Sequence, residues 1–179
     1  MANIPRLVGA PDFGKLVAPE ESLGKRLEGK RVLLTGTTKG VGRVTQELLC
    51  AQGAFVCGSG RSKGVAAEVA NELVAKGYKA AGFDVDLSDY EAVKKWVADC
   101  AELMGGIDIV INNASHPGMA PFGEMTPDIW AYGIQNELDL VYNVCNCAWP
   151  HLIEAGGGSI IITSSTVGLQ GSNSPQACH

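Results

Sequence analysis

The stretch T-G-T-T-K-G-V-G, residues 35–42, decides the fold that we expect for this chain. It follows a short apolar run, Arg31–Leu34, which has the character of a buried strand, and it precedes apolar residues at helical spacing over Val44–Ala51. A strand, a glycine-rich turn and a helix form the start of a βαβ unit. The N–H groups that open the helix, and glycines that let a ligand approach the backbone, suit a phosphate. On this stretch alone, an ordinary strand-to-helix turn remains an open alternative.

Length and composition predict one globular domain. The chain has 179 residues and is 46% hydrophobic, enough for a sizeable core. Its net charge of −5 and pI near 5.2 argue against a surface for nucleic acid or an anionic membrane. No apolar run approaches the ~18 residues of a membrane span, and residues 1–30 lack the apolar segment of a signal peptide. We therefore expect a cytoplasmic protein with no nucleic-acid or membrane partner.

The cysteines follow neither a disulfide framework nor metal-ligand spacing. There are six of them: Cys50, Cys57, Cys100, Cys145, Cys147 and Cys178. Cys145 and Cys147 lie two apart in an expected helix, so their side chains diverge. We predict reduced, mostly buried thiols and no metal site.

The order of the segments predicts the fold class. Residues 1–29 have no sustained periodicity and form an expected N-terminal arm, whereas strand-like and helix-like segments alternate over residues 30–179. Such alternation indicates α/β architecture, a doubly wound parallel sheet of the Rossmann type. We expect strands at Arg31–Leu34, Ala54–Gly58, Lys79–Val85, Ile107–Ile111 and Ser159–Thr163. Beyond the first helix, we expect helices at Val65–Lys76, from Asp89 onward with Ser88 as its cap, and at Asp128–Glu154 with Pro150 bending or ending it.

Polar residues follow every expected strand, and ligands of such sheets bind beyond the carboxyl ends of the strands. An acidic residue about 20 residues after the glycine loop would bind a ribose 2′-OH, whereas an arginine would accept a 2′-phosphate. Gly60 occupies the acid position, Arg61 follows it, and Lys39 adds a second cation. We therefore predict NADP as the cofactor, with NAD possible; the alternative is a pair of solvated surface charges. Asp86 either accepts a hydrogen bond from the adenine amino group or is a plain loop residue.

Several motifs together resemble the short-chain dehydrogenase/reductase family. The glycine loop has the family's T-G-x-x-x-G-x-G spacing, and Asn112-Asn113-Ala114-Ser115 resembles its N-N-A-G motif. Ile160–Ser165 is similar to the strand that ends at the family's active-site serine. Asn136 stands at the position of the family's active-site asparagine. The resemblance extends over residues 27–179.

The resemblance implies hydride exchange between NAD(P) and a small-molecule carbonyl or alcohol. It implies that Ser165 polarises the substrate oxygen and that Asn136 holds a water of the proton relay. With Arg61 and Asp86 from the argument above, the expected cofactor-binding residues are Gly36, Thr38, Lys39, Gly40, Val41, Gly42, Arg61, Asp86, Leu87, Asn113 and Ala114.

The chain departs from the family pattern at several positions. The family's tyrosine would fall near Cys178 or His179; His179 stands in its place, and no lysine follows. Histidine is itself a competent acid or base near neutral pH, so His179 is a third catalytic candidate. Ser115 replaces the motif's glycine, and Glu137 and Asp139 stand where the family has apolar and small residues.

The family's sheet has two further strands, so we expect strand five to have an unpaired outer side in this sequence. We interpret this as a domain whose C-terminal strands are missing from the sequence, or as a homo-oligomer or an edge completed by another chain. Two alternatives to an active enzyme remain: a catalytically silent subunit that binds nucleotide or a partner, and a nucleotide-sensing module. In the loop after strand four, His116, Met119 and Phe122 either line the substrate pocket or pack the loop.

Overall fold

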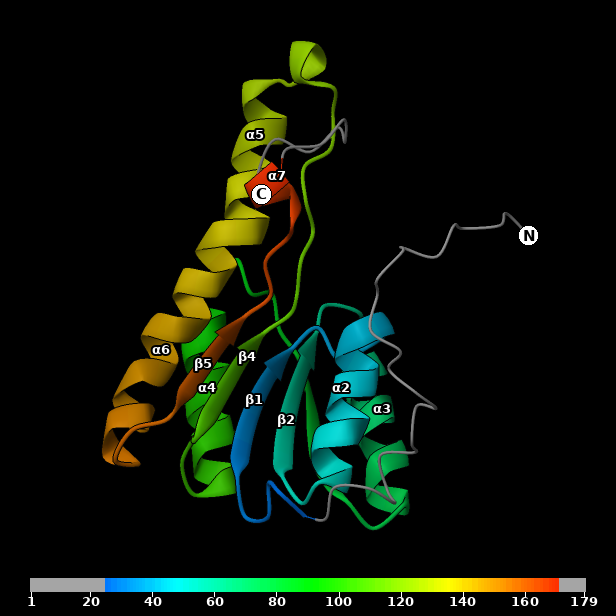
Figure 1. Ribbon diagram of the computed structural model, residues 1–179, viewed down its shortest axis with the longest axis vertical. Coiled ribbons are helices and arrows are strands. Elements are labelled where there is room, and N and C mark those ends of the chain that lie inside the picture. The colour runs from blue at the N-terminus through cyan, green and yellow to red at the C-terminus, as the bar shows by residue number, and fades with distance from the viewer. Residues whose placement is uncertain (1–24, 171–179) are drawn as a thin grey trace, which may run out of the picture.

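The computed structural model describes residues 25–170, and within them it has a five-stranded parallel sheet (Figure 1). The strands lie in the order β3-β2-β1-β4-β5. Their bounds are Arg31–Thr35 for β1, Phe55–Gly60 for β2, Lys79–Asp84 for β3, Ile109–Asn112 for β4 and Ser159–Ile162 for β5. The chain moves outward from β1 to β3 and then crosses to β4 on the other side of β1. This reversal confirms the predicted doubly wound sheet and creates a switch point between β1 and β4.

Helices cover both faces of the sheet. They are α2 (Gly40–Ala51), α3 (Val65–Ala75), α4 (Tyr90–Met104), α5 (Pro127–Ile134), α6 (Leu140–Glu154) and α7 (Val167–Gln170), with a 3₁₀ turn η1 at Phe122–Glu124. A π-helical turn, η2 (Gln135–Asp139), joins α5 to α6. Figure 1 shows α5, η2 and α6 as one long rod whose α5 end extends past the carboxyl ends of the strands.

Alternate residues of the central strands supply two apolar cores. Leu33 and Val110 belong to a buried cluster with Trp96 of α4 and Val144 of α6. Val32, Leu34 and Val56 form a second cluster with Cys50 of α2 and Leu73 of α3. Because side chains alternate between faces along a strand, one sheet is packed by helices on both sides, and its central strands are almost wholly apolar.

The starts and irregularities of the helices differ from expectation at two places. Asp89, not Ser88, caps α4: its carboxylate accepts from the backbone N–H groups of Glu91 and Ala92, at 3.0 and 3.1 Å. Ser88 instead donates its hydroxyl to Asp86 at 2.7 Å, so its side chain is already engaged. Pro150 lies inside α6, which continues to Glu154. The break in regular α-helix occurs earlier, at η2.

Within residues 25–170, strand β5 forms one edge of the sheet, and the unpaired outer side was expected for strand five. Ile161 and Ile162 are about half exposed there. Among residues 25–170, no helix combines the length and apolarity needed to cross a membrane.

The cysteines of the described part of the chain are free thiols. Cys50, Cys57 and Cys100 are buried, whereas Cys145 and Cys147 are partly exposed. Within the same residues, no group of three or more His, Cys, Asp or Glu side chains is placed to hold a metal ion. Cys178, His179 and most of the expected N-terminal arm lie outside the described residues.

Candidate functional site

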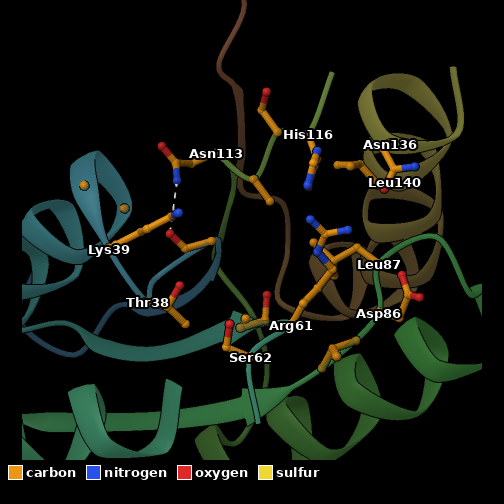
Figure 2. A pocket seen from close by; sticks show the side chains of 18 of the residues that line it. Thr38, Lys39, Arg61, Ser62, Asp86, Leu87, Asn113, His116, Asn136 and Leu140 are labelled. Carbon is orange, nitrogen blue, oxygen red and sulfur yellow. Dashed lines mark hydrogen bonds between the residues drawn. The ribbon is translucent and has the colours of Figure 1, made fainter. Parts of the chain in front are cut away.

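A crevice of about 490 Å³ opens at the carboxyl ends of the strands, over the switch point. It is bounded by the glycine loop, by the segments that follow β2, β3 and β4, and by the helical rod. Figure 2 shows Thr38 and Lys39 on one side and Asn136 and Leu140 on the other, with the guanidinium of Arg61 between them. Residues from five different elements or loops therefore converge on one space.

The glycine loop offers the crevice a helix N-terminus. Lys39 is the N-cap of α2, its side chain makes no capping hydrogen bond, and the first turn of α2 contains no acidic residue. The first N–H groups of the helix are thus left for an external acceptor, and the helix dipole favours a negative charge there. A Cβ atom on Gly42 would lie 2.0 Å from the carbonyl oxygen of Gly36, so the loop folds this tightly only with glycine at position 42. These features fit the phosphates of a dinucleotide.

A hydrogen-bond cluster joins the glycine loop to the end of β4. The buried hydroxyl of Thr35 accepts from the backbone N–H groups of Asn113 and Ala114, each at 2.9 Å. The amide nitrogen of Asn113 donates in return to the carbonyl oxygens of Thr35 and Gly36, at 3.1 and 3.4 Å. Two motifs that lie 78 residues apart in the sequence are therefore one structural unit. Asn113 holds the loop and lines the crevice at the same time.

The ends of β2 and β3 carry the charged residues of the crevice. Lys39 and Arg61 are its two basic lining residues, and Asp86 is its single carboxylate among the residues that the structure describes. Hydrogen bonds from the hydroxyl and N–H of Ser88, and to a lesser degree the positive charge of Arg61, lower the pKa of Asp86. Asp86 is therefore ionised at neutral pH, and the local charge of this end is one net positive.

Asn136 lies in the π-helical turn η2 on the opposite wall and is 7% exposed. Its amide nitrogen donates to the carbonyl oxygen of Tyr132, one turn earlier, at 2.9 Å. This bond fixes the side chain and leaves the amide oxygen as an acceptor. A π-helical turn widens the helix locally and is often found at functional sites.

The structure brings most of the predicted site residues together. All eleven expected cofactor-binding residues and Asn136 line the crevice, and so does His116. Ser165 is not among the lining residues; it follows β5, and its hydroxyl accepts from the N–H of Val167 at 3.3 Å. Phe122 is 84% exposed, and Met119 lines a smaller, separate hollow. His179 lies outside the described residues.

Other lining residues were not anticipated. They are Ser59, Ser62, Val85, Ser88, Ser115 and Leu140; Gly60, which stands at the position expected for a ribose-binding acid, lines the crevice as well. Most of them are next in sequence to a predicted residue at the end of a strand, so their place in the crevice could have been predicted from the sequence. Leu140 could not have been predicted in this way, because its place in the crevice depends on how α6 packs.

Fold and site together define a class of protein. A glycine-rich turn between β1 and a helix, set at the switch point of a doubly wound parallel sheet, is the arrangement of dinucleotide-binding α/β domains. Residues 30–177 match the family described as short chain dehydrogenase. The chain belongs to the short-chain dehydrogenase/reductase family.

Individual relatives agree with this assignment. The chain is 32% identical to the 3-oxoacyl-(acyl-carrier-protein) reductase FabG of Vibrio harveyi, over 81% of this chain and 58% of that protein. It is 33% identical to the 7alpha-hydroxysteroid dehydrogenase of Clostridium sardiniense, over 80% of this chain and 56% of that protein. A crystal structure of a short chain dehydrogenase from Mycobacterium smegmatis superposes with a TM-score of 0.79 at 26% identity, covering 84% of this chain and 64% of that one. The chain thus spans somewhat more than half the length of these relatives.

Proposed function

We propose that the protein containing this chain is an NADP-dependent oxidoreductase that interconverts a carbonyl and an alcohol by hydride transfer. The observation that supports this most is the convergence on one crevice of the glycine loop, Arg61, Asp86, Asn113 and Asn136. When bound, the nicotinamide ring supplies or accepts the hydride. The small-molecule substrate then occupies the end of the crevice next to Asn136.

The roles of the residues follow from their positions. The N–H groups at the start of α2 bind the pyrophosphate, because the side chain of the N-cap residue Lys39 does not cap them and the first turn has no competing carboxylate. Asn113 keeps the loop in place through its bonds to Thr35 and Gly36. The amide oxygen of Asn136 accepts a hydrogen bond from a water of the proton relay, since the amide nitrogen is already used. Ser165 polarises the substrate oxygen, which requires the segment after β5 to approach the crevice when substrate binds.

The cofactor preference rests on charge. Lys39 and Arg61 line the end of the crevice that receives the adenosine, and Gly60 leaves no carboxylate at the end of β2 to repel a 2′-phosphate. Arginine binds phosphate through charge-assisted, often bidentate hydrogen bonds. We therefore assign NADP, rather than NAD, as the cofactor.

Titration of the protein with NADPH and NADH, followed by tryptophan fluorescence or calorimetry, tests this assignment. The wild type is expected to bind NADPH more tightly, and Arg61→Ala to weaken NADPH binding about 10- to 100-fold while leaving NADH nearly unchanged. Lys63→Ala is the matched control, because Lys63 is exposed and does not line the crevice. A preference for NADH, or equal losses in both variants, would contradict the assignment.

A second candidate is a subunit that binds nucleotide without turnover. It is favoured by Ser165, which does not line the crevice in the described structure. NADPH oxidation with a panel of ketones separates the two candidates. Turnover that Ser165→Ala abolishes supports the enzyme, whereas tight NADPH binding without turnover supports the silent subunit.

We also propose that the protein is a homo-oligomer or is completed by another chain. Large apolar side chains recur at helical spacing on the rod and are more than half exposed: Leu138, Tyr142, Trp149 and Ile153. The adjacent edge strand β5 adds Ile161 and Ile162. Sedimentation velocity of the protein measures its oligomeric state directly. The cytoplasmic location remains a prediction from the sequence.

A further inference from the structure

Two residues that depart from the family pattern, Ser115 and Glu137, meet in the structure. A single carboxylate oxygen of Glu137 accepts from the hydroxyl of Ser115 at 2.9 Å and from the backbone N–H of His116 at 2.6 Å. Ser115 and His116 belong to the segment after β4, and Glu137 to η2, more than 20 residues later. A glycine at 115 would lack the hydroxyl, and an apolar residue at 137 would lack the acceptor. The bond from Ser115 therefore depends on both departures, whereas the bond from His116 depends on Glu137 alone.

A second contact ties the same segment to α5. The imidazole of His116 lies edge-on to the ring of Tyr132, with centroids 5.6 Å apart and planes at 90°. This geometry is favourable for aromatic pairs. The carbonyl oxygen of Tyr132 is the acceptor that fixes the amide of Asn136. The segment after β4 is thus attached to the same turn that positions Asn136.

The attachment determines one wall of the crevice. Ser115 and His116 both line it, and Figure 2 shows His116 between Asn113 and Asn136. Within the described residues, the ring nitrogens of His116 have no hydrogen-bond partner, so they remain available to a ligand. Hydrogen bonds to an ionised acceptor are stronger than neutral ones, and one that accepts twice from neighbouring groups restrains both.

We propose that Glu137 is a positioning residue that anchors Ser115 and His116 to the π-helical turn. The imidazole of His116 then faces the ligand at the end of the crevice next to Asn136. The proposal deepens the proposed function and rests on it for the identity of the ligand. Glu137 acts through His116 and does not itself line the crevice.

Amide hydrogen exchange of the full chain, read by NMR, tests the anchor without any cofactor. Glu137→Ala is expected to speed exchange of the His116 amide about tenfold, and Glu137→Gln, which keeps an acceptor oxygen, to restore most of the protection. Asp139→Ala is the matched control, because Asp139 is an exposed carboxylate in the same turn. Equal exchange rates in wild type and Glu137→Ala, or equal acceleration by Asp139→Ala, would overturn the proposal. Should Glu137→Ala fail to fold, Ser115→Ala removes one of the two donors and must speed exchange by a smaller factor.

Titration with NADPH tests the consequence for the crevice. Glu137→Ala is expected to raise the Kd for NADPH about fivefold, with Glu137→Gln and Asp139→Ala close to wild type. Unchanged NADPH affinity in a Glu137→Ala variant whose His116 amide exchanges faster would overturn the link between anchor and ligand. A wild-type chain that binds no NADPH would refute the proposed function instead, and the exchange comparison would still decide whether Glu137 holds the segment.

Discussion

Replacing Asp108 by asparagine tests the ion pair that joins the amino ends of β1 and β4, at the opposite end of the strands from the crevice. The carboxylate of Asp108 accepts from the backbone N–H of Arg31 at 2.9 Å and from its guanidinium at 2.8 Å through two nitrogens. A third guanidinium nitrogen donates to the carbonyl oxygen of Gly105. The side chains of Arg31 and Asp108 are only 24% and 18% exposed, so water screens the pair modestly. The pair fixes the start of β1 beside the start of β4.

The pKa of Asp108 gives the magnitude. Hydrogen bonds and charge from Arg31 lower this pKa from 3.8 to about 2. Because one pKa unit corresponds to about 1.4 kcal/mol, the ionised carboxylate adds about 2 kcal/mol to the free energy of unfolding at neutral pH. A pKa that is lower in the folded state means that this stability is complete above about pH 4 and is lost as the pH falls toward 2.

Urea denaturation followed by circular dichroism at several pH values measures this effect. Asp108→Asn is expected to lose about 2 kcal/mol at pH 7, and the difference from wild type should shrink between pH 4 and pH 2. Asp99→Asn is the control: its ion pair with Lys95 is exposed, so its loss should stay below about 0.5 kcal/mol. A difference between Asp108→Asn and wild type that is absent at pH 7, or that stays constant down to pH 2, would refute the reasoning.

Two further substitutions test the loop and a helix cap. Gly42→Ala places a methyl group 2.0 Å from the carbonyl oxygen of Gly36, so the loop must shift and NADPH affinity should fall at least about tenfold, measured by fluorescence titration. Retained affinity would show that the phosphates bind elsewhere. Asp89→Ala removes the acceptor of two N–H groups at the start of α4 and should cost about 1 kcal/mol in urea denaturation. Ser88→Ala should cost less, and the reverse order would show that Ser88 is the cap.

The features that the sequence determined by itself are local. A strand, a glycine turn and a helix could be read from residues 30–51, because the period of apolar residues and the backbone freedom of glycine act within a few residues. The parallel, doubly wound sheet followed from the alternation of such units. Once the strands were placed, the polar residues at their ends had to share one edge, so Arg61, Asp86 and Asn113 were predicted to converge.

Features that depend on distant or competing partners required the tertiary structure. Asp89 and Ser88 are both favourable N-cap residues. Asp89 caps α4 because the hydroxyl of Ser88 is already bonded to the carboxylate of Asp86. The π-helical turn η2 could not be predicted either, because the helix propensities of its residues do not distinguish an α-helical from a π-helical turn.

The contact between Ser115 and Glu137 shows the same limit most clearly. Each residue alone was visible only as a departure from a pattern. Their hydrogen bond exists because β4 ends beside the rod, which the packing of α6 against β4 and α4 decides. Whether two side chains so far apart in the sequence meet depends on strand register and helix packing together. No single stretch of sequence determines both.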